Sequence, residues 1–173
     1  EEYYIKVLKT ICTRDRDYRY WRNLMRPLAD SRIAKLKGGS ISNYEAVQLI
    51  KPWIHILKNL NEEEKLKELY EKVYRVNSEL NLDYARWLKD KGREDEATKI
   101  AEEGLKEFNR SDRTELLKLL VDLYEARSPE KYVANLMKLY RDKPNGKYYR
   151  ELKGAVPDGQ WSNIRSWLEE KLY

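Results

Sequence analysis

The sequence predicts an all-α protein made of stacked antiparallel helix hairpins, and three observations support this. Apolar residues recur at intervals of three and four along most of the 173-residue chain, as they do on one face of an amphipathic helix. Sustained alternation of apolar and polar residues, which indicates half-buried strands, is nearly absent. The breaks between helical stretches are short, and helices joined by short connections pack as antiparallel neighbours. We therefore expect about nine to eleven helices and no sheet.

Residues 1–60 are expected to form a basic helical segment that packs on the rest of the array. This segment has twelve Lys and Arg against six Asp and Glu, a net charge of +6, whereas the whole chain has +5. Four large apolar residues in it are spaced for one face of a helix and are expected in the core: Tyr18, Trp21, Met25 and Leu28.

Residues 61–173 are expected to form further helix hairpins and to make one continuous domain with the basic segment. The first helix begins at Glu62–Glu64, where carboxylates suit the positive end of the helix dipole. Its apolar pattern continues through Val76–Leu80. Another helix is expected to begin at Ser128 and Pro129, an N-cap followed by proline at the first helical position.

The most informative motif runs from Gly92 to Ala97 (Gly-Arg-Glu-Asp-Glu-Ala). A helix has to end at Gly92, and a second has to start at once with acidic residues in its first turn. Small side chains leave room for a neighbouring helix to approach closely, and this hairpin has four of them at suitable positions: Ala85, Ala97, Ala101 and Gly104.

This spacing resembles a tetratricopeptide repeat, whose 34-residue unit is a helix–turn–helix. On that pattern the unit starts near Ser78, Leu88 takes the large apolar position and Gly92 takes the turn. Asn81 stands where the pattern has a large aromatic residue, and Glu94 where it has tyrosine. The resemblance implies a short α-solenoid of degenerate TPR-like hairpins.

The C-terminal part is similar to the helical region that follows the zinc finger in SWIM-type zinc-finger proteins. The similarity covers roughly residues 80–173 and is carried by three segments: Tyr148–Lys153, Trp161–Arg165 and Leu168–Leu172. It implies a scaffold. The finger of that family needs a Cys-x-Cys and a Cys-x-His pair, which this sequence lacks. The finger is therefore expected upstream of Glu1 or has been lost.

The chain has one cysteine, Cys12, and one histidine, His55, and this excludes several kinds of chemistry. A structural zinc site cannot be built from two nitrogen and sulfur ligands. No glycine-rich phosphate-binding motif and no G-x-S-x-G nucleophile motif occurs. We expect no cofactor, no metal and no enzymatic activity. His55 is expected to be half-buried and hydrogen-bonded.

The first functional hypothesis is a non-enzymatic scaffold that binds another protein. Repeat stacks present the first helix of each pair to a ligand. In the Gly92 unit the ligand-facing positions are Glu79, Leu82, Arg86 and Lys89. Arg86 and Lys89 would meet an acidic group, and Leu82 would give apolar contact. Alternatively, this face packs on the preceding helix or is solvated.

The second hypothesis is a nucleic-acid-associated protein that uses the basic segment. Its candidate phosphate-binding residues share one helix face near the aromatic side chains: Arg19, Arg22 and Arg26. Alternatively, these arginines are solvated or paired with Asp15, Asp17 and Asp30.

Composition gives two broader expectations. Many charges of both signs with few thermolabile residues are typical of proteins from hot environments. No apolar run approaches the roughly 20 residues of a membrane-spanning helix. We therefore expect a cytoplasmic protein with no membrane partner.

Overall fold

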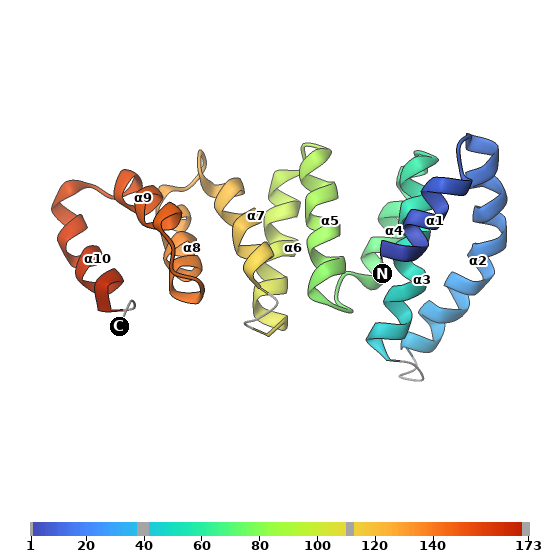
Figure 1. Ribbon diagram of the computed structural model, residues 1–173, viewed down its shortest axis with the longest axis horizontal. Coiled ribbons are helices and arrows are strands. Elements are labelled where there is room, and N and C mark those ends of the chain that lie inside the picture. The colour runs from blue at the N-terminus through green and yellow to red at the C-terminus, as the bar shows by residue number, and fades with distance from the viewer. Residues whose placement is uncertain (1, 38–41, 110–112, 171–173) are drawn as a thin grey trace. The chain divides into compact units, whose positions relative to one another are not determined.

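The computed structural model describes residues 2–37, 42–109 and 113–170. Over these residues the chain forms ten helices and no strand (Figure 1). The prediction of an all-α chain is thus confirmed. The chain divides into two compact units, residues 1–80 and residues 81–173. This division falls inside α5 (Ser78–Asp90).

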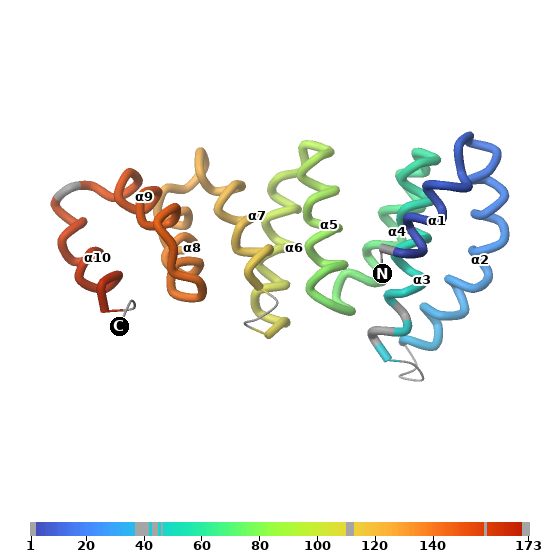
Figure 2. The backbone as a smooth tube through the Cα atoms, viewed as in Figure 1, coloured from blue at the N-terminus to red at the C-terminus, as the bar shows by residue number. Residues whose placement is uncertain are grey.

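The first unit is arranged around α3 (Asn43–Asn59). Three other helices pack on α3: α1 (Glu2–Ile11), α2 (Asp15–Lys37) and α4 (Glu63–Val73). Figure 2 shows α2 and α3 running antiparallel. One broad face of α3 is buried, as expected of an amphipathic helix that packs against its neighbours: Val47, Ile50, Trp53, Ile54, Ile56 and Leu57. In its last turn Lys58 and Asn59 are exposed.

Both ends of α3 are fixed by the local sequence. At its start the Ser42 hydroxyl accepts from the Glu45 backbone N–H at 3.2 Å, and the Glu45 carboxylate accepts from the Ser42 N–H at 3.0 Å. This is a capping box. At its end Asn61 adopts a left-handed φ of 52°, and the Glu62 N–H donates to the Leu57 carbonyl at 3.1 Å. Asn61 therefore takes the left-handed position that glycine usually occupies after the end of a helix.

Cys12–Arg14 separates α1 from α2, a break that the periodicity of the sequence did not predict. The Asp17 carboxylate accepts from the backbone N–H groups of Thr13 and Arg14, at 3.1 and 3.0 Å. These hydrogen bonds, that from Thr13 above all, lower the pKa of Asp17. The turn is thus fixed by a side chain just inside α2, a signal that apolar spacing does not contain.

The core stripe predicted on α2 is partly wrong. Met25 is buried and Tyr18 and Trp21 are half-buried, but Leu28 is 53% exposed. The small side chain of Ala29 is buried instead, with 1% of it exposed. Residues 25 and 29 are four apart and share a face, so the buried face of α2 runs through Ala29 and leaves Leu28 outside.

The second unit contains the rest of α5 and five further helices: α6 (Glu94–Glu107), α7 (Thr114–Tyr124), α8 (Pro129–Asp142), α9 (Gly146–Ala155) and α10 (Asp158–Glu170). Each of α6, α7 and α8 packs on the helix that follows it. Leu136 and Tyr140 of α8, Leu152 of α9 and Leu168 of α10 form one buried cluster.

The α5–α6 hairpin has the turn that the sequence predicts. Gly92 has a left-handed φ of 71°. Its N–H donates to the Lys89 carbonyl at 2.8 Å, and the Arg93 N–H donates to the Leu88 carbonyl at 2.9 Å. These two bonds make a Schellman motif, so the end of α5 and the immediate start of α6 at Glu94 are confirmed.

The small residues of this hairpin are also where the sequence places them. Ala85, Ala97 and Ala101 are fully buried. A Cβ atom on Gly104 would lie 2.4 Å from the Asn81 Oδ1 atom, so Gly104 leaves the space that Asn81 fills. Asn81 stands where the tetratricopeptide pattern has a large aromatic residue, and Gly104 on the partner helix lies opposite it.

The boundary between α4 and α5 differs from the sequence prediction. The apolar pattern continues through Val76–Leu80, but α4 ends at Val73 and α5 begins at Ser78. The Asn77 side chain accepts from the Leu80 N–H at 2.8 Å, the geometry of an N-cap. The start of α8 at Pro129 is as predicted, although the Ser128 side chain makes no capping hydrogen bond.

Candidate functional site

The ligand-facing residues predicted on α5 are already engaged within the chain. Arg86 forms an ion pair with Glu115 of α7 at 3.2 Å, and Lys89 pairs with Asp122 of the same helix. Leu82 is only 8% exposed. Its assignment as an apolar ligand contact was therefore wrong: the side chain belongs to the core.

Glu79, the fourth residue of that set, pairs with Lys51 of α3. The inward-facing residues of the same helix are confirmed, since Ala85 and Leu88 are fully buried. Arg86 and Lys89 remain partly exposed, with 53% and 33% of their side chains accessible. Arg86 and Lys89 thus pair with carboxylates of α7, and this face of α5 presents two neutralised cations.

A shallow groove of about 410 Å³ adjoins this contact in the second unit. It lies among α7, α8 and α9, and Asp122, the partner of Lys89, is part of its wall. Tyr132 and Tyr148 line it together with Val121. A groove therefore lies beside the predicted binding residues Arg86 and Lys89. Leu82 does not line this groove.

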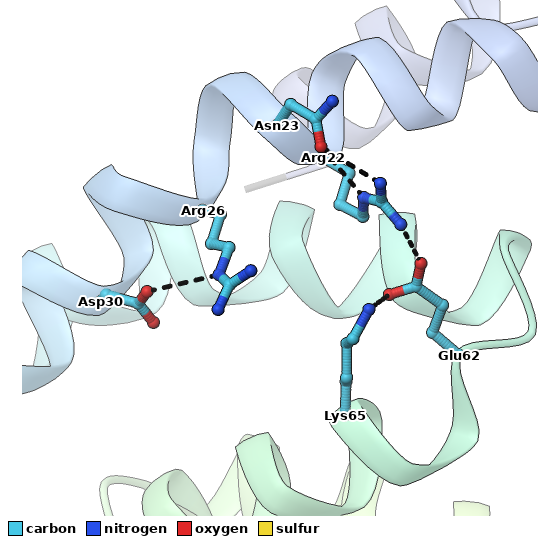
Figure 3. Close-up of polar contacts among 6 residues, drawn as sticks. All are labelled: Arg22, Asn23, Arg26, Asp30, Glu62 and Lys65. Carbon is cyan, nitrogen blue, oxygen red and sulfur yellow. Dashed lines mark hydrogen bonds and ion pairs between the residues drawn. The ribbon is translucent and has the colours of Figure 1, made fainter.

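The three arginines predicted to contact phosphates on α2 have different environments. Arg19 is exposed. Arg22 is 28% exposed and pairs with Glu62, which is 17% exposed. Arg26 is 69% exposed and lies 3.8 Å from the Asp30 carboxylate. Figure 3 shows Arg22 and Lys65 directed at the two oxygens of Glu62, while Arg26 faces Asp30.

Arg22 and Arg26 lie on the wall of a groove of about 600 Å³ formed by α2, α3 and α4; below it is called the α2–α4 groove. Its floor is apolar, because four lining residues are each less than a tenth exposed: Ile33, Trp53, Leu57 and Leu69. Ala34 also lines the groove and is exposed. The floor is supplied by the core faces of α2, α3 and α4, and the walls by their outer edges.

Charges of both signs line the two walls. The groove has four cationic residues and three carboxylates: Arg22, Arg26, Lys65, Lys72, Asp30, Glu62 and Glu68. Within the described part of the chain, no ion pair is found for Lys72 or Glu68. The walls therefore keep charged groups that can pair with a ligand.

Glu62 is fixed at the end of the groove where α4 begins. Burial works against its ionisation, but hydrogen bonds from Lys65 and Arg22 outweigh it and lower the pKa of Glu62. The Lys65 ammonium lies 2.8 Å from one carboxylate oxygen. Glu62 is thus a charged clamp that joins α2 to α4 at neutral pH.

Among the side chains that the structure describes, no group of three His, Cys, Asp or Glu residues could hold a metal ion. His55 is half-buried, as predicted, and its burial lowers the pKa of its ring, with Lys9 and Lys58 adding to the effect. The Asn59 amide donates to the His55 carbonyl at 2.8 Å.

Sequence reasoning found Arg22 and Arg26 but missed the groove in which they lie. The signal lies in α4, where Lys65, Glu68 and Lys72 recur at intervals of three and four and therefore share one face. α2 and α4 both pack on α3 and line the same groove. This tertiary arrangement cannot be read from the spacing of residues in the sequence. No helix in the described ranges has the length and apolarity needed to cross a membrane.

Comparisons with known proteins give no match: no family model, no curated protein and no solved structure resembles the chain. The resemblances to tetratricopeptide repeats and to the SWIM helical region therefore stay predictions.

Proposed function

We propose that this chain is a non-enzymatic helical scaffold that binds a segment of another protein in the α2–α4 groove. The observation that carries the proposal is the combination of a buried apolar floor with charged walls of both signs in a space of about 600 Å³. Grooves with an apolar floor and a few polar groups at the edge are typical of ligand sites.

The charges of the groove favour a protein segment over a nucleic acid. A phosphate backbone is uniformly negative, and its affinity comes from cations that neutralise it. Here Glu62 already neutralises Arg22, and Asp30 and Glu68 would repel phosphates. A protein segment with side chains of both signs can pair with both kinds of wall residue. Nucleic-acid binding through Arg19, Arg22 and Arg26 is the alternative, and its affinity would fall steeply with salt.

The groove also indicates the chemistry of the bound segment. Arg26 is 69% exposed, and its contact with Asp30 at 3.8 Å is long, so it is available to a carboxylate of the ligand. Lys72 offers a second cation and Glu68 an anion. An apolar side chain between these contacts would cover Trp53 and Leu69 and gain the favourable burial of apolar area.

The TPR-like character of the α5–α6 hairpin is part of this proposal. It is supported by the left-handed Gly92 and by the fully buried Ala85 and Ala97. One such hairpin supplies rigid packing without supplying a site. A cytoplasmic location is proposed on composition alone.

The proposal is tested with peptides selected from a displayed random library on the immobilised protein. Ala34 is exposed and lines the groove, so Ala34→Gln fills part of the groove without changing the core. Ala126 is exposed and lies outside the groove, so Ala126→Gln is the matched control. We expect Ala34→Gln to weaken the selected peptides at least about tenfold, or about 1.4 kcal/mol, and Ala126→Gln to leave their affinity unchanged. Equal affinities for the two variants would overturn the proposal.

A further inference from the structure

Large apolar side chains are exposed on two helices of the first unit. Among the described residues, seven such side chains are at least about a third exposed, and all lie on α1 and α2: Tyr3, Tyr4, Val7, Ile11, Tyr20, Leu24 and Leu28. Scattered apolar residues are ordinary on a protein surface, whereas a contiguous apolar row marks an interaction site. None of the seven residues lines the α2–α4 groove.

Three of these residues form a straight ridge on α2, called the α2 ridge. Tyr20, Leu24 and Leu28 are spaced four apart, so they follow one row along the helix. The ridge is about 12 Å long at 1.5 Å per residue. Its members are 66%, 49% and 53% exposed. The opposite face of α2, with Met25 and Ala29, is the one buried in the unit.

Cations surround the ridge. Arg16 is four residues before Tyr20 and Lys35 is seven after Leu28, so each lies on the same side of the helix as the ridge. Arg16 and Lys35 are both exposed. Asp17 accepts from the backbone N–H groups of Thr13 and Arg14 and also lies 3.6 Å from the Arg16 guanidinium, which stays 76% exposed.

We propose that the α2 ridge binds an amphipathic helix of another protein whose apolar face is flanked by acidic residues. A row of side chains at a spacing of four fits the groove between the rows of a second helix. Carboxylates beside that helix's apolar face would pair with Arg16 and Lys35. Tyrosine and arginine together are typical of protein interfaces.

The charge of the ridge argues against a second copy of this chain as the occupant. Two copies that met ridge to ridge would bring Arg16 and Lys35 of each close to those of the other, and like charges facing each other at an interface are costly. Nucleic acid would not cover Leu24 and Leu28, because its outer surface is charged. An anionic membrane surface would satisfy both the cations and the apolar side chains, so it has to be separated by experiment.

The probe is a synthetic peptide of roughly three heptads with leucine along one face and glutamate on both flanks. A second peptide has lysine in place of every glutamate. Binding to the full chain is measured by fluorescence anisotropy at low salt. We expect the glutamate peptide to bind and the lysine peptide to bind at least about tenfold more weakly.

Two variants locate the contact. Leu24→Ser removes the middle of an exposed ridge, so the fold is expected to persist, and the glutamate peptide should bind at least about tenfold more weakly. Ala34→Gln in the groove should leave this binding unchanged, which separates the inference from the proposed function. Circular dichroism melting of both variants confirms folding.

The inference is overturned if the two peptides bind equally, if neither binds, or if Leu24→Ser has no effect. It is also overturned if sedimentation shows that the chain dimerises through the ridge and Leu24→Ser makes it monomeric. Binding to vesicles of phosphatidylserine and phosphatidylcholine, lost in Leu24→Ser, without peptide binding would assign the ridge to a lipid surface instead.

Discussion

The Asn81 side chain occupies the space that a methyl group on Gly104 would need. Asn81 is fully buried on α5, and Gly104 faces it from α6. Neither Oδ1 nor Nδ2 of Asn81 has a hydrogen-bond partner within the described part of the protein. Such a polar group is costly to bury, so the fit between Asn81 and Gly104 is a matter of shape rather than of hydrogen bonding.

We predict that Gly104→Ala destabilises the protein by about 1–3 kcal/mol, the usual cost of overpacking. The new Cβ would lie 2.4 Å from Asn81 Oδ1 and 2.9 Å from Leu116 Cδ1. In an open helix the same change is stabilising by roughly 0.5–1 kcal/mol. Gly154 in α9 has no atom within 4 Å of its would-be Cβ, so Gly154→Ala is the control. Urea denaturation measures both, and a Gly104→Ala variant as stable as Gly154→Ala would contradict the packing described.

A second prediction concerns the small side chain of Ala97. It is fully buried in the α5–α6 hairpin, so Ala97→Leu should overpack the contact and cost about 1–3 kcal/mol. The midpoint of chemical denaturation is the measurement. An unchanged midpoint would show that α5 and α6 separate easily at this position.

His55 should titrate below about 6.5, its ordinary pKa. Burial lowers its pKa, and the nearby charges of Lys9 and Lys58 lower it further. A lowered pKa in the folded state means that the unfolded state binds the proton more tightly. The contribution of His55 to stability is therefore complete above the unfolded pKa and is lost as the pH falls through the folded pKa.

Imidazole NMR signals measure this titration. Lys9→Ala should raise the midpoint, because one repelling charge is removed, and Lys6→Ala on the same helix is the control. A midpoint that Lys9→Ala leaves in place would mean that α1 does not lie against α3 as described.

The double variant Arg86→Ala with Lys89→Ala tests the face of α5 predicted from the sequence. Both residues form partly exposed ion pairs with α7, and such pairs contribute about 1 kcal/mol or less each. We expect a small loss of stability and an unchanged set of partners in a pull-down followed by mass spectrometry. Loss of those partners would move the binding surface to α5 and α7.

Local signals in the sequence were sufficient for much of the second unit. Gly92 has no side chain and can adopt the left-handed conformation that ends a helix. Ala97 and Gly104 have a small side chain or none, so another helix can approach them closely. The break at Asn77 was missed because an asparagine cap interrupts an apolar pattern that otherwise reads as continuous. Leu28 was misplaced because a spacing of three or four does not say which of two overlapping faces is buried.

The candidate site depended more on tertiary packing. Arg22 and Arg26 were recognised as neighbours, but the sequence cannot show that Glu62, forty positions away, neutralises Arg22. The groove exists because α2 and α4 both pack on α3. Similarly, the spacing of Leu82 in the sequence did not predict its burial.

The most direct test of the central claim is photo-cross-linking in a lysate of the source organism from a benzophenone amino acid placed at position 34, inside the α2–α4 groove, with position 126 as control. We predict an adduct at position 34 that is destroyed by protease and resists nuclease, and none at position 126. An adduct that nuclease removes, or equal protein adducts at both positions, would contradict the account.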